Sequence, residues 1–287
     1  MVADGIRSPL AAPERSSRLT RRLLAPNPGP MTLDGTNSYL LAEPGHADVV
    51  IVDPGPLDEP HLSTLARAGR VALIIVTHQH ADHTAGSARL AELTGAPIRA
   101  FDAAHCIAGA PLVDGELIDA AGVRLRIVAS PGHTADSICV HLPDDGVAGS
   151  HDIGSDDIAG RAGTDGTAGA VLTGDTILGT GSTVIGHPDG TLHDYLSSLA
   201  TLQAIGPALV LPAHGPPLAD LDAVCAQYLR HRHDRLRQVR QALQELGLEA
   251  SDAQVTDRVY AQADARVRVA AEASVRAQLA YLSRDSA

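Results

Sequence analysis

Short β-branched runs alternate with turns marked by glycine and proline from residue 31 to about residue 217. This alternation is typical of strands joined by loops. Between residues 123 and 127, apolar side chains alternate with two arginines, which predicts a strand with one buried face. The pattern predicts strands at Asn37–Leu41, Val49–Val52, Val71–Val76, Val123–Ala129, Ile138–Leu142, Val171–Thr173 and Ala208–Leu211.

Two stretches between these strands carry helical signals. Ala85–Leu93 is expected to be a helix that Thr84 caps and Gly95 ends. Leu192–Ile205 is expected to be a second helix, because Thr191 precedes it and an acidic residue follows three positions later, as in a capping box. This part of the chain is therefore expected to combine strands and helices.

Helical periodicity replaces the turn signals after residue 217. It predicts three helices, at Leu221–Leu246, Asp252–Ala261 and Arg266–Leu282. We therefore predict two domains, a larger mixed domain at residues 1–217 and a helical domain at residues 218–287.

Residues 143–169 differ from the rest of the larger domain, because they contain seven glycines and six aspartates. A segment with so few apolar side chains buries too little surface to order itself. We predict a flexible insertion here. A calcium-binding loop is the alternative, but the spacing of the aspartates is irregular.

Composition limits the class of protein. Hydrophobic residues make up 44% and charged residues 20% of the 287 positions, so the chain can bury a sizeable core. The longest aliphatic run, Val71–Val76, is too short to cross a bilayer, and the N-terminus lacks an apolar stretch of signal-peptide length. Three scattered cysteines do not make a disulfide framework. A cytoplasmic protein with no membrane partner is expected.

All 22 basic residues are arginines, against 34 acidic residues, and the formal net charge is −12. An acidic protein does not attract nucleic acid through its long-range field. The one basic concentration is the run Arg230–Arg237, which Arg240 extends along a helix face. It could position a phosphate backbone or coenzyme A. The alternative is a solvated helix exterior that faces the acidic domain.

The strongest chemical signal is the run Thr77-His78-Gln79-His80-Ala81-Asp82-His83, directly after a predicted strand. Clustered imidazoles and carboxylates are costly to desolvate unless a cation shares them. Three further candidates also lie at or just beyond the ends of predicted strands, each beside a glycine. The predicted metal ligands are His78, His80, Asp82, His83, His133, Asp175 and His214.

Five histidines and two aspartates are enough for two cations that share one carboxylate. Nitrogen-dominated ligation favours Zn²⁺, with Mn²⁺ or Fe²⁺ as alternatives. Two ions about 3.5–4 Å apart can hold a bridging hydroxide that is a nucleophile near neutral pH, which predicts hydrolysis. A closed structural zinc site is the alternative, but such sites favour cysteine and need only four ligands.

The order HxHxDH, followed at a distance by His, Asp and His, resembles the metallo-β-lactamase superfamily. The resemblance implies an α+β fold, a four-layer αββα sandwich with the metals at one edge of its two sheets. Carried over by position, the resemblance implies that a first zinc ion is held by His78, His80 and His133. It implies that a second zinc ion is held by Asp82, His83 and His214, and that Asp175 bridges the two.

Further motifs resemble a narrower set of proteins within that superfamily, the lactamase-beta-2-like group. The motifs are Asn27-Pro28-Gly29-Pro30-Met31-Thr32, Gly35-Thr36-Asn37-Ser38-Tyr39-Leu40, Asp53-Pro54-Gly55, Leu178-Gly179-Thr180-Gly181-Ser182-Thr183-Val184 and Pro212-Ala213-His214-Gly215-Pro216. That group includes a single-stranded RNA endonuclease and fungal thioesterases that release polyketides. Its usual C-terminal domain implies a winged-helix-like fold for residues 218–287, and Val275–Leu282 resembles its last helix.

Several residues near the predicted ligands have two interpretations. Asp53 either forms a turn or, as the family comparison implies, orients a metal ligand. Asn37 and Tyr39 either look toward the site or serve strand pairing and core packing. Asp82 is assigned a catalytic role as a proton relay, besides its role as a ligand.

Together these features predict a dinuclear zinc-dependent hydrolase. A thioester or other small acyl ester fits the acidic composition and the absence of most of the usual wing from the sequence. Single-stranded RNA fits the family resemblance and the arginine run, although aromatic residues that could stack on bases are only 2% of the chain. A β-lactam substrate and a non-catalytic metal-binding regulatory module are further alternatives. The oligomeric state stays undetermined.

Overall fold

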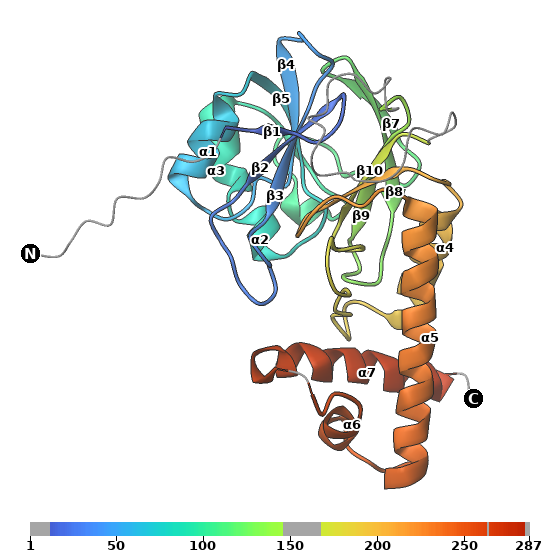
Figure 1. Ribbon diagram of the computed structural model, residues 1–287. Helices are drawn as coiled ribbons and strands as arrows, with labels where there is room; N and C mark the ends of the chain where they lie inside the picture. Colours follow the sequence, from blue (N-terminus) through green and yellow to red (C-terminus); the bar gives the residue numbers. More distant parts are fainter. Residues whose placement is uncertain (1–11, 146–167, 263, 285–287) are drawn as a thin grey trace, which may run out of the picture.

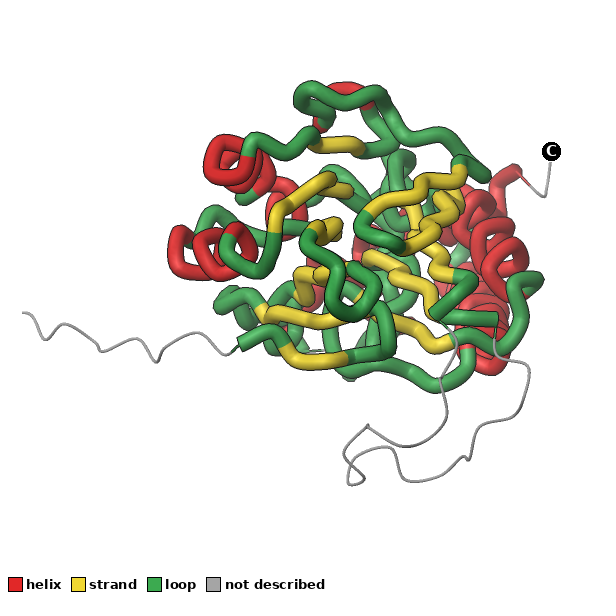
Figure 2. Tube along the Cα trace, turned by 90° about the horizontal axis from the view of Figure 1, so that it is seen from above, coloured by secondary structure: helices red, strands yellow, loops and turns green. Residues whose placement is uncertain are grey.

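Two β-sheets pack face to face, and helices cover the outer face of each (Figure 1). The structure is a computed structural model that describes residues 12–145, 168–262 and 264–284. Figure 2 shows the strands in the middle of the molecule and helices on both sides of them. The expected α+β fold class with a four-layer αββα sandwich is confirmed.

The first sheet has six strands in the order β1-β2-β3-β4-β5-β6. They are β1 (Glu14–Arg15), β2 (Thr20–Leu24), β3 (Asn37–Leu41), β4 (Asp48–Val52), β5 (Arg70–Ile75) and β6 (Ile98–Arg99). Strands β1 to β4 are antiparallel, whereas β4, β5 and β6 run parallel. The carboxyl ends of β4 and β5 therefore lie at the same edge, where the histidine-rich run begins.

The second sheet has five strands in the order β11-β10-β9-β8-β7. They are β7 (Leu117–Ala120), β8 (Val123–Ala129), β9 (Ile138–Leu142), β10 (Ala170–Gly174) and β11 (Leu209–Pro212). Strands β10 and β11 are parallel, and the other pairs are antiparallel. The ends of β10 and β11 therefore bring Asp175 and His214 to one edge of this sheet.

The helices divide between the two sheets and a C-terminal part. Helices α1 and α3 pack on the first sheet, α4 and the first half of α5 pack on the second, and α6 and α7 follow α5. The bounds are α1 (Glu59–Ala66), α2 (Ala81–Thr84), α3 (Ser87–Thr94), α4 (Leu192–Gln203), α5 (Leu221–Leu246), α6 (Asp252–Val259) and α7 (Arg268–Arg284), with short 3-10 turns at Ala103–His105 and Ala265–Val267. Among the described helices, none has the length and apolar character needed to span a bilayer.

Apolar side chains on both faces of the central strands build the core. On β4, Val50 and Val52 face the opposite sheet, whereas Val49 and Ile51 belong to the cluster under α1 and α3. Successive side chains of a strand point to opposite faces, so a strand buried on both faces is a continuous apolar run. This explains why the short apolar runs predicted the central strands to within one residue at each end.

The helix predicted at residues 85–93 begins later than expected. The chain forms α2 up to Thr84 and then starts α3 at Ser87, with Gly86 as the residue before it. Gly86 donates its backbone N–H to the carbonyl of Gly55, and a Cβ there would lie 2.7 Å from Leu62. This close approach of two chain segments breaks the helix, and Thr84 is not its cap.

The apolar pattern does not reveal β1, β2, β6, β7 or α1. Strands β1, β6 and β7 lie at sheet edges, and β7 has no buried side chain. Helix α1 begins after Asp58, whose side chain accepts the backbone N–H of His61, and it has Pro60 in its first turn. Short exposed edge strands carry few apolar positions, so their sequence signal is weak.

The C-terminal part consists of α5, α6 and α7, which share a small core of Val239, Ala242, Val255 and Val275. Figure 1 shows α5 running from the sandwich into this part. Within residues 213–262 and 264–284 no strand is found, so the wing implied by the family resemblance is not seen there. The division at residues 217 and 218 stays a prediction.

The predicted flexible insertion at residues 143–169 lies largely outside the described residues. Its described beginning is well anchored, because Asp145 has only 2% of its surface exposed. The Asp145 carboxylate accepts hydrogen bonds from the backbone N–H of Leu19 and from the hydroxyls of Ser17 and Thr20. The turn after β9 is therefore fastened to the start of β2.

Replacing Asp145 with alanine is expected to destabilise the protein by about 2–3 kcal/mol, because three buried donors lose their acceptor. Urea denaturation measures the loss. The neighbouring carboxylate of Asp144 is exposed, so Asp144→Ala is the matched control and is expected to stay within about 0.5 kcal/mol of the unaltered protein. Equal stability of the two variants would contradict the anchoring role.

Candidate metal centre

All seven predicted ligands come together at one edge of the two sheets. The first sheet contributes the run after β5, and the second sheet contributes the β8–β9 loop and the ends of β10 and β11. His80 is the residue before α2 and has extended backbone angles, so the run turns into a helix at Ala81. Asp82 and His83 then lie on the first turn of α2, on the same side as the strand ends.

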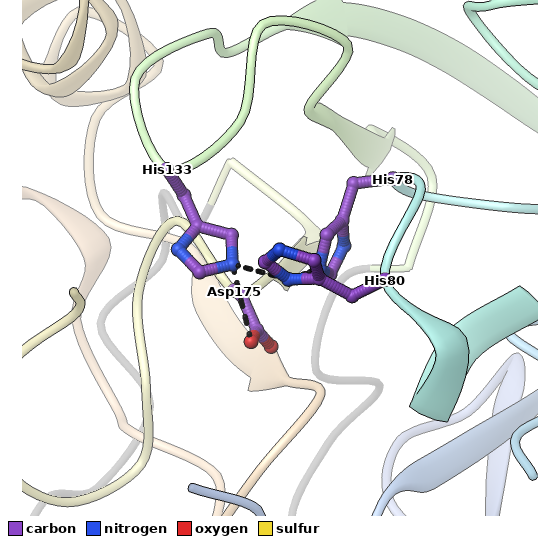
Figure 3. Close-up of side chains that lie close together, drawn as sticks. All are labelled: His78, His80, His133 and Asp175. Carbon is purple, nitrogen blue, oxygen red and sulfur yellow. Dashed lines mark hydrogen bonds and ion pairs between the residues drawn. The ribbon is translucent and has the colours of Figure 1, made fainter. Parts of the chain in front are cut away.

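His78, His80, His133 and Asp175 form a first group, whose ligand atoms all lie within 4.8 Å of one another. The Nδ1 atom of His80 is 3.0 Å from Nε2 of His78 and 3.0 Å from Nε2 of His133. His133 Nε2 is 3.6 Å from Asp175 Oδ2. Figure 3 shows the three rings and the carboxylate converging. Nitrogen ligands of one tetrahedral zinc ion lie about 3.3 Å apart, so the group has a suitable size.

Asp82, His83 and His214 form a second group. Asp82 Oδ2 lies 3.1 Å from His214 Nε2 and 3.4 Å from His83 Nε2. Both histidines are buried, whereas the Asp82 side chain is 28% exposed. The second group therefore reaches from the core to a partly open side of the site.

Asp175 connects the two groups. Its Oδ2 atom faces His133, and its Oδ1 atom lies 3.3 Å from His214 Nε2 and 3.6 Å from His83 Nε2. One carboxylate oxygen is thus directed at each group. This is the arrangement that a carboxylate shared by two cations requires.

The outward nitrogens of three buried rings contact acceptors in the surrounding protein. His83 Nδ1 is 2.9 Å from Asp53 Oδ2, and His133 Nδ1 is 2.7 Å from the carbonyl of Val184. His214 Nδ1 is 3.1 Å from the carbonyl of Gly35. Each acceptor places a proton on Nδ1 and leaves the Nε2 lone pair free toward the site, as metal-ligating histidines need.

Thr77 provides the acceptor for the outward nitrogen of a fourth ring, His78. Its hydroxyl donates to Asp53 Oδ2 at 2.8 Å, so its oxygen is free to accept the Nδ1–H of His78 at 3.1 Å. Asp53 also accepts the backbone N–H of Thr77 at 2.8 Å. Its backbone has φ +52°, a left-handed conformation. Asp53 therefore serves both in the turn and as the carboxylate that orients His83 and, through Thr77, His78.

Three buried atoms that face the site lie close to one another, but none of them makes a hydrogen bond of suitable geometry among the described residues. They are Nε2 of His83, Nε2 of His214 and Oδ1 of Asp175. A buried polar atom without a partner is costly, and bound cations or waters commonly satisfy such atoms. The donor set, nitrogen with some carboxylate oxygen, fits a transition-metal ion such as zinc.

The carboxylates give this edge a strong attraction for positive charge. Burial lowers the pKa of His83, but Asp53 and Asp175 outweigh burial and raise it well above its ordinary value. Burial likewise lowers the pKa of His214, whereas Asp175 and Asp82 raise it to about 9. In each case the carboxylates favour a cation at the imidazole, either a proton or a metal ion.

Asn37 and Tyr39 on β3 hold the loop that carries His214. The Asn37 side chain donates to the carbonyls of Pro212 and Gly215, at 2.8 and 3.0 Å. The Tyr39 hydroxyl donates to the Pro212 carbonyl at 2.8 Å. These bonds join the first sheet to the end of β11, so both residues position a candidate ligand without facing it.

Two glycines beside candidate ligands are required by space as well as by backbone angle. Gly132, before His133, has φ +138°, and a Cβ there would lie 2.4 Å from the Cα of Tyr195 in α4. Gly174, before Asp175, has φ +49° and would meet the Thr77 hydroxyl at 2.9 Å. Glycine is thus needed where the β8–β9 loop rests on α4 and where the end of β10 approaches Thr77 of the other sheet.

The structure adds contacts that the sequence pattern does not signal. Gln79 donates to Asp189 Oδ2 at 2.7 Å, and Asp189 also accepts the backbone N–H of Ala135 at 3.1 Å. These bonds link the run after β5 to the β8–β9 loop. Backbone carbonyls such as those of Gly35 and Val184 have no sequence signal at all, because every residue carries one. The assignment of the seven ligands itself stays a prediction.

The arginine run on α5 does not form a uniform basic face. Arg232 is buried, Arg235 lies over the ring of Tyr260 at 4.6 Å, and Arg237 pairs with Asp234. Two of these arginines therefore pack within the protein, whereas the Arg237–Asp234 pair lies on the exposed surface of the helix, so the run is partly packed and partly solvated.

Comparisons with known proteins agree with this geometry. The profile of the metallo-beta-lactamase superfamily matches residues 31–153. The beta-lactamase-like protein 2 homolog of Caenorhabditis elegans is 30% identical over 285 residues, which cover 95% of this chain and 86% of that protein. The chain belongs to the metallo-β-lactamase superfamily. It is accordingly a hydrolase, as predicted.

Other members of the superfamily match in sequence or in fold. The atrochrysone carboxyl ACP thioesterase of Aspergillus fumigatus is 29% identical, over 78% of this chain and 65% of that protein. A metallo-beta-lactamase family protein from Thermus thermophilus has a TM-score of 0.71 at 22% identity, covering 93% and 94% of the two chains. A beta-lactamase domain protein from Burkholderia ambifaria has a TM-score of 0.73, also at 22% identity, covering 99% and 91%. These two structures support the fold.

The buried side chain of His61 packs against the turn that contains Asp53. His61 Nε2 lies 2.9 Å from the Ser38 hydroxyl, and a Cβ on Gly55 would be 3.5 Å from the same nitrogen. Burial lowers the pKa of His61 to about 4, against an ordinary value of 6.5. The folded protein therefore keeps this ring neutral at a pH where the unfolded chain protonates it.

Stability is expected to fall between pH 6.5 and pH 4 because of His61. Its contribution is complete above pH 6.5 and is lost as the pH falls toward the folded pKa, by on the order of 3 kcal/mol. Urea denaturation across this range, with a chelator present throughout, compares the protein with His61→Gln. The variant is expected to have the flatter profile, and parallel profiles would contradict the assignment.

Proposed function

We propose that this protein is a dinuclear zinc-dependent hydrolase that cleaves thioesters or other small acyl esters. The observation that carries the proposal is the pair of ligand groups with one oxygen of Asp175 directed at each. His78, His80 and His133 would hold one ion, and Asp82, His83 and His214 the other. Two bound zinc ions would polarise the acyl carbonyl and activate water for attack on it.

The chain's own residues prepare the site for these ions. Asp53 and the carbonyls of Val184 and Gly35 keep Nδ1 protonated on three rings, so the ligand nitrogens are oriented before an ion arrives. Such preorganisation reduces the rearrangement that accompanies the reaction.

Asp82 suits a ligand or a proton acceptor better than an acid. Burial raises its pKa, but contacts with His214 and His83 outweigh burial and hold the pKa below its ordinary value. The carboxylate therefore stays ionised, and its partial exposure leaves it open to a proton released from water. We propose it as the proton relay in that direction.

The substrate proposal rests on two independent observations. One relative is named as a thioesterase, and this chain is 29% identical to it over 78% of its own length. The formal net charge of −12 also disfavours a polyanionic substrate, because like charges repel on approach. A small acyl ester does not meet that barrier.

Single-stranded RNA is the second candidate, because the sequence resembles a group that includes such an endonuclease. The arginine run is its main support. The contacts of Arg232 and Arg235 within the protein weaken that support, whereas Arg237 lies on the exposed surface of the helix. For a β-lactam substrate and for a non-catalytic regulatory module, no feature of the described residues gives comparable support.

Metal analysis tests the shared premise. Protein purified without chelator and supplied with zinc is expected to contain about two ions per chain. Asp175→Ala is expected to reduce the content to one ion or fewer, because each group loses a ligand. Asp144→Asn changes an exposed carboxylate elsewhere and should keep the full content. Fewer than one ion in the unaltered protein would overturn the proposal.

Substrate assays separate the two candidate functions. We expect hydrolysis of acyl thioesters, and His80→Ala is expected to lower kcat/KM on the order of 100-fold. Thioester cleavage should change little between about 50 and about 200 mM salt, whereas RNA binding would weaken steeply over that range. Efficient, salt-sensitive RNA cleavage without thioester hydrolysis would favour the endonuclease.

A further inference from the structure

The loop between Asp175 and Gly186 touches several parts of the candidate metal centre. It begins with Asp175, and its Val184 carbonyl accepts the Nδ1–H of His133 at 2.7 Å. Gly186 donates its backbone N–H to the carbonyl of His133 at 3.1 Å, and Gly179 donates to the carbonyl of His214 at 2.8 Å. The shape of this loop therefore affects ligands in both groups.

Helix α5 holds this loop from the outside. The Tyr228 hydroxyl lies 3.1 Å from both the backbone N and the carbonyl O of Leu178. Arg232, one turn further along α5, donates from Nη2 to the carbonyl of Thr183. In Figure 1 the loop, in yellow, runs beside the middle of α5. The C-terminal part is thus in direct contact with a loop of the site.

Arg232 is an unusual residue to find in this position. It is 2% exposed, and no carboxylate pairs with it among the described residues. Its guanidinium lies over the Tyr195 ring, 4.8 Å from the centroid, and its Nε atom has no partner in the described chain. Burying a guanidinium without a carboxylate is costly. Its charge-assisted hydrogen bond goes to the carbonyl next to the one that orients His133.

We propose that Arg232 is a positioning residue for His133, so that α5 forms part of the metal centre. This inference rests on the proposed function. Arg232 fixes the Thr183 carbonyl, and the Thr183 hydroxyl donates to the carbonyls of Asp175 and Thr176, at 2.8 and 3.1 Å. With Thr183 held on both sides, the next carbonyl, that of Val184, is directed at His133 Nδ1.

The pair Arg232→Met and Arg235→Met provides the test. Both arginines lie on α5 and both stack on a tyrosine, but Arg235 bonds to Gln238, and among the described residues it has no hydrogen bond to the loop at residues 175–186. Arg232→Met is expected to weaken zinc binding roughly 10-fold in competition with a chelator. Arg235→Met is expected to stay within about 2-fold, and equal effects of the two changes would overturn the proposal.

Nuclear magnetic resonance of the metal-free protein gives a second readout that does not depend on activity. The Nδ1–H of His133 is expected to exchange slowly with solvent, because the Val184 carbonyl accepts it in a buried setting. Arg232→Met should speed this exchange at least about 10-fold, whereas Arg235→Met should leave it unchanged. Unchanged exchange in Arg232→Met would contradict the positioning role.

A double-mutant cycle separates positioning from general stability. If Arg232 acts through His133, then Arg232→Met should change zinc affinity less than about 2-fold in a His133→Ala background. A full 10-fold effect in that background would refute the link. Should Arg232→Met fail to fold, Arg232→Lys keeps the charge and a donor, and is expected to retain most of the affinity.

The outcomes distinguish this inference from the proposed function. If the unaltered protein binds no zinc, the proposed function fails, and the exchange of the His133 Nδ1–H still tests the contact with Arg232. If the unaltered protein binds two ions and Arg232→Met matches it in zinc affinity and in exchange, the inference fails and the proposed function stands.

Discussion

Four buried imidazoles must each direct the lone pair of Nε2 at the same small volume. The groups around them hold the rings in that orientation. Each ring can present that lone pair only if its other nitrogen has an acceptor, because a neutral imidazole carries one proton on one of two nitrogens. Asp53, Thr77 and the carbonyls of Gly35 and Val184 are those acceptors. The orientation of these candidate ligands is therefore fixed by groups that do not themselves face the site.

These acceptors belong to segments that are far apart in the chain, and the packing of the two sheets brings them together. Asn37 on the first sheet holds the loop after β11 on the second, and Gly132 allows the β8–β9 loop to rest on α4. Closely packed interiors transmit small displacements, so a shift of one layer moves the side chains of the site. The contact of α5 with the loop at residues 175–186 extends this dependence to the C-terminal part.

Charge supports both the candidate metal site and the proposed preference for a small acyl substrate over RNA. At the sheet edge, Asp53, Asp82 and Asp175 surround the histidines and favour a cation. Over the whole chain, acidic residues outnumber arginines, and two arginines of α5, Arg232 and Arg235, are engaged in contacts within the protein. The same excess of negative charge that suits a pair of metal ions opposes the approach of a polyanion.

The sequence by itself determined the central strands and singled out the seven candidate ligands, and its resemblance to the metallo-β-lactamase superfamily implied the fold class. Strands buried on both faces are continuous apolar runs, and His, Asp and Gly at the ends of such runs have few other physical explanations. The tertiary structure alone decided the break of the helix at Gly86, the edge strands and the role of Asp53. It also decided the place of Arg232, which in the sequence is one member of a basic run. Such features depend on carbonyl acceptors and close approaches between distant segments, and a linear pattern of side chains contains neither.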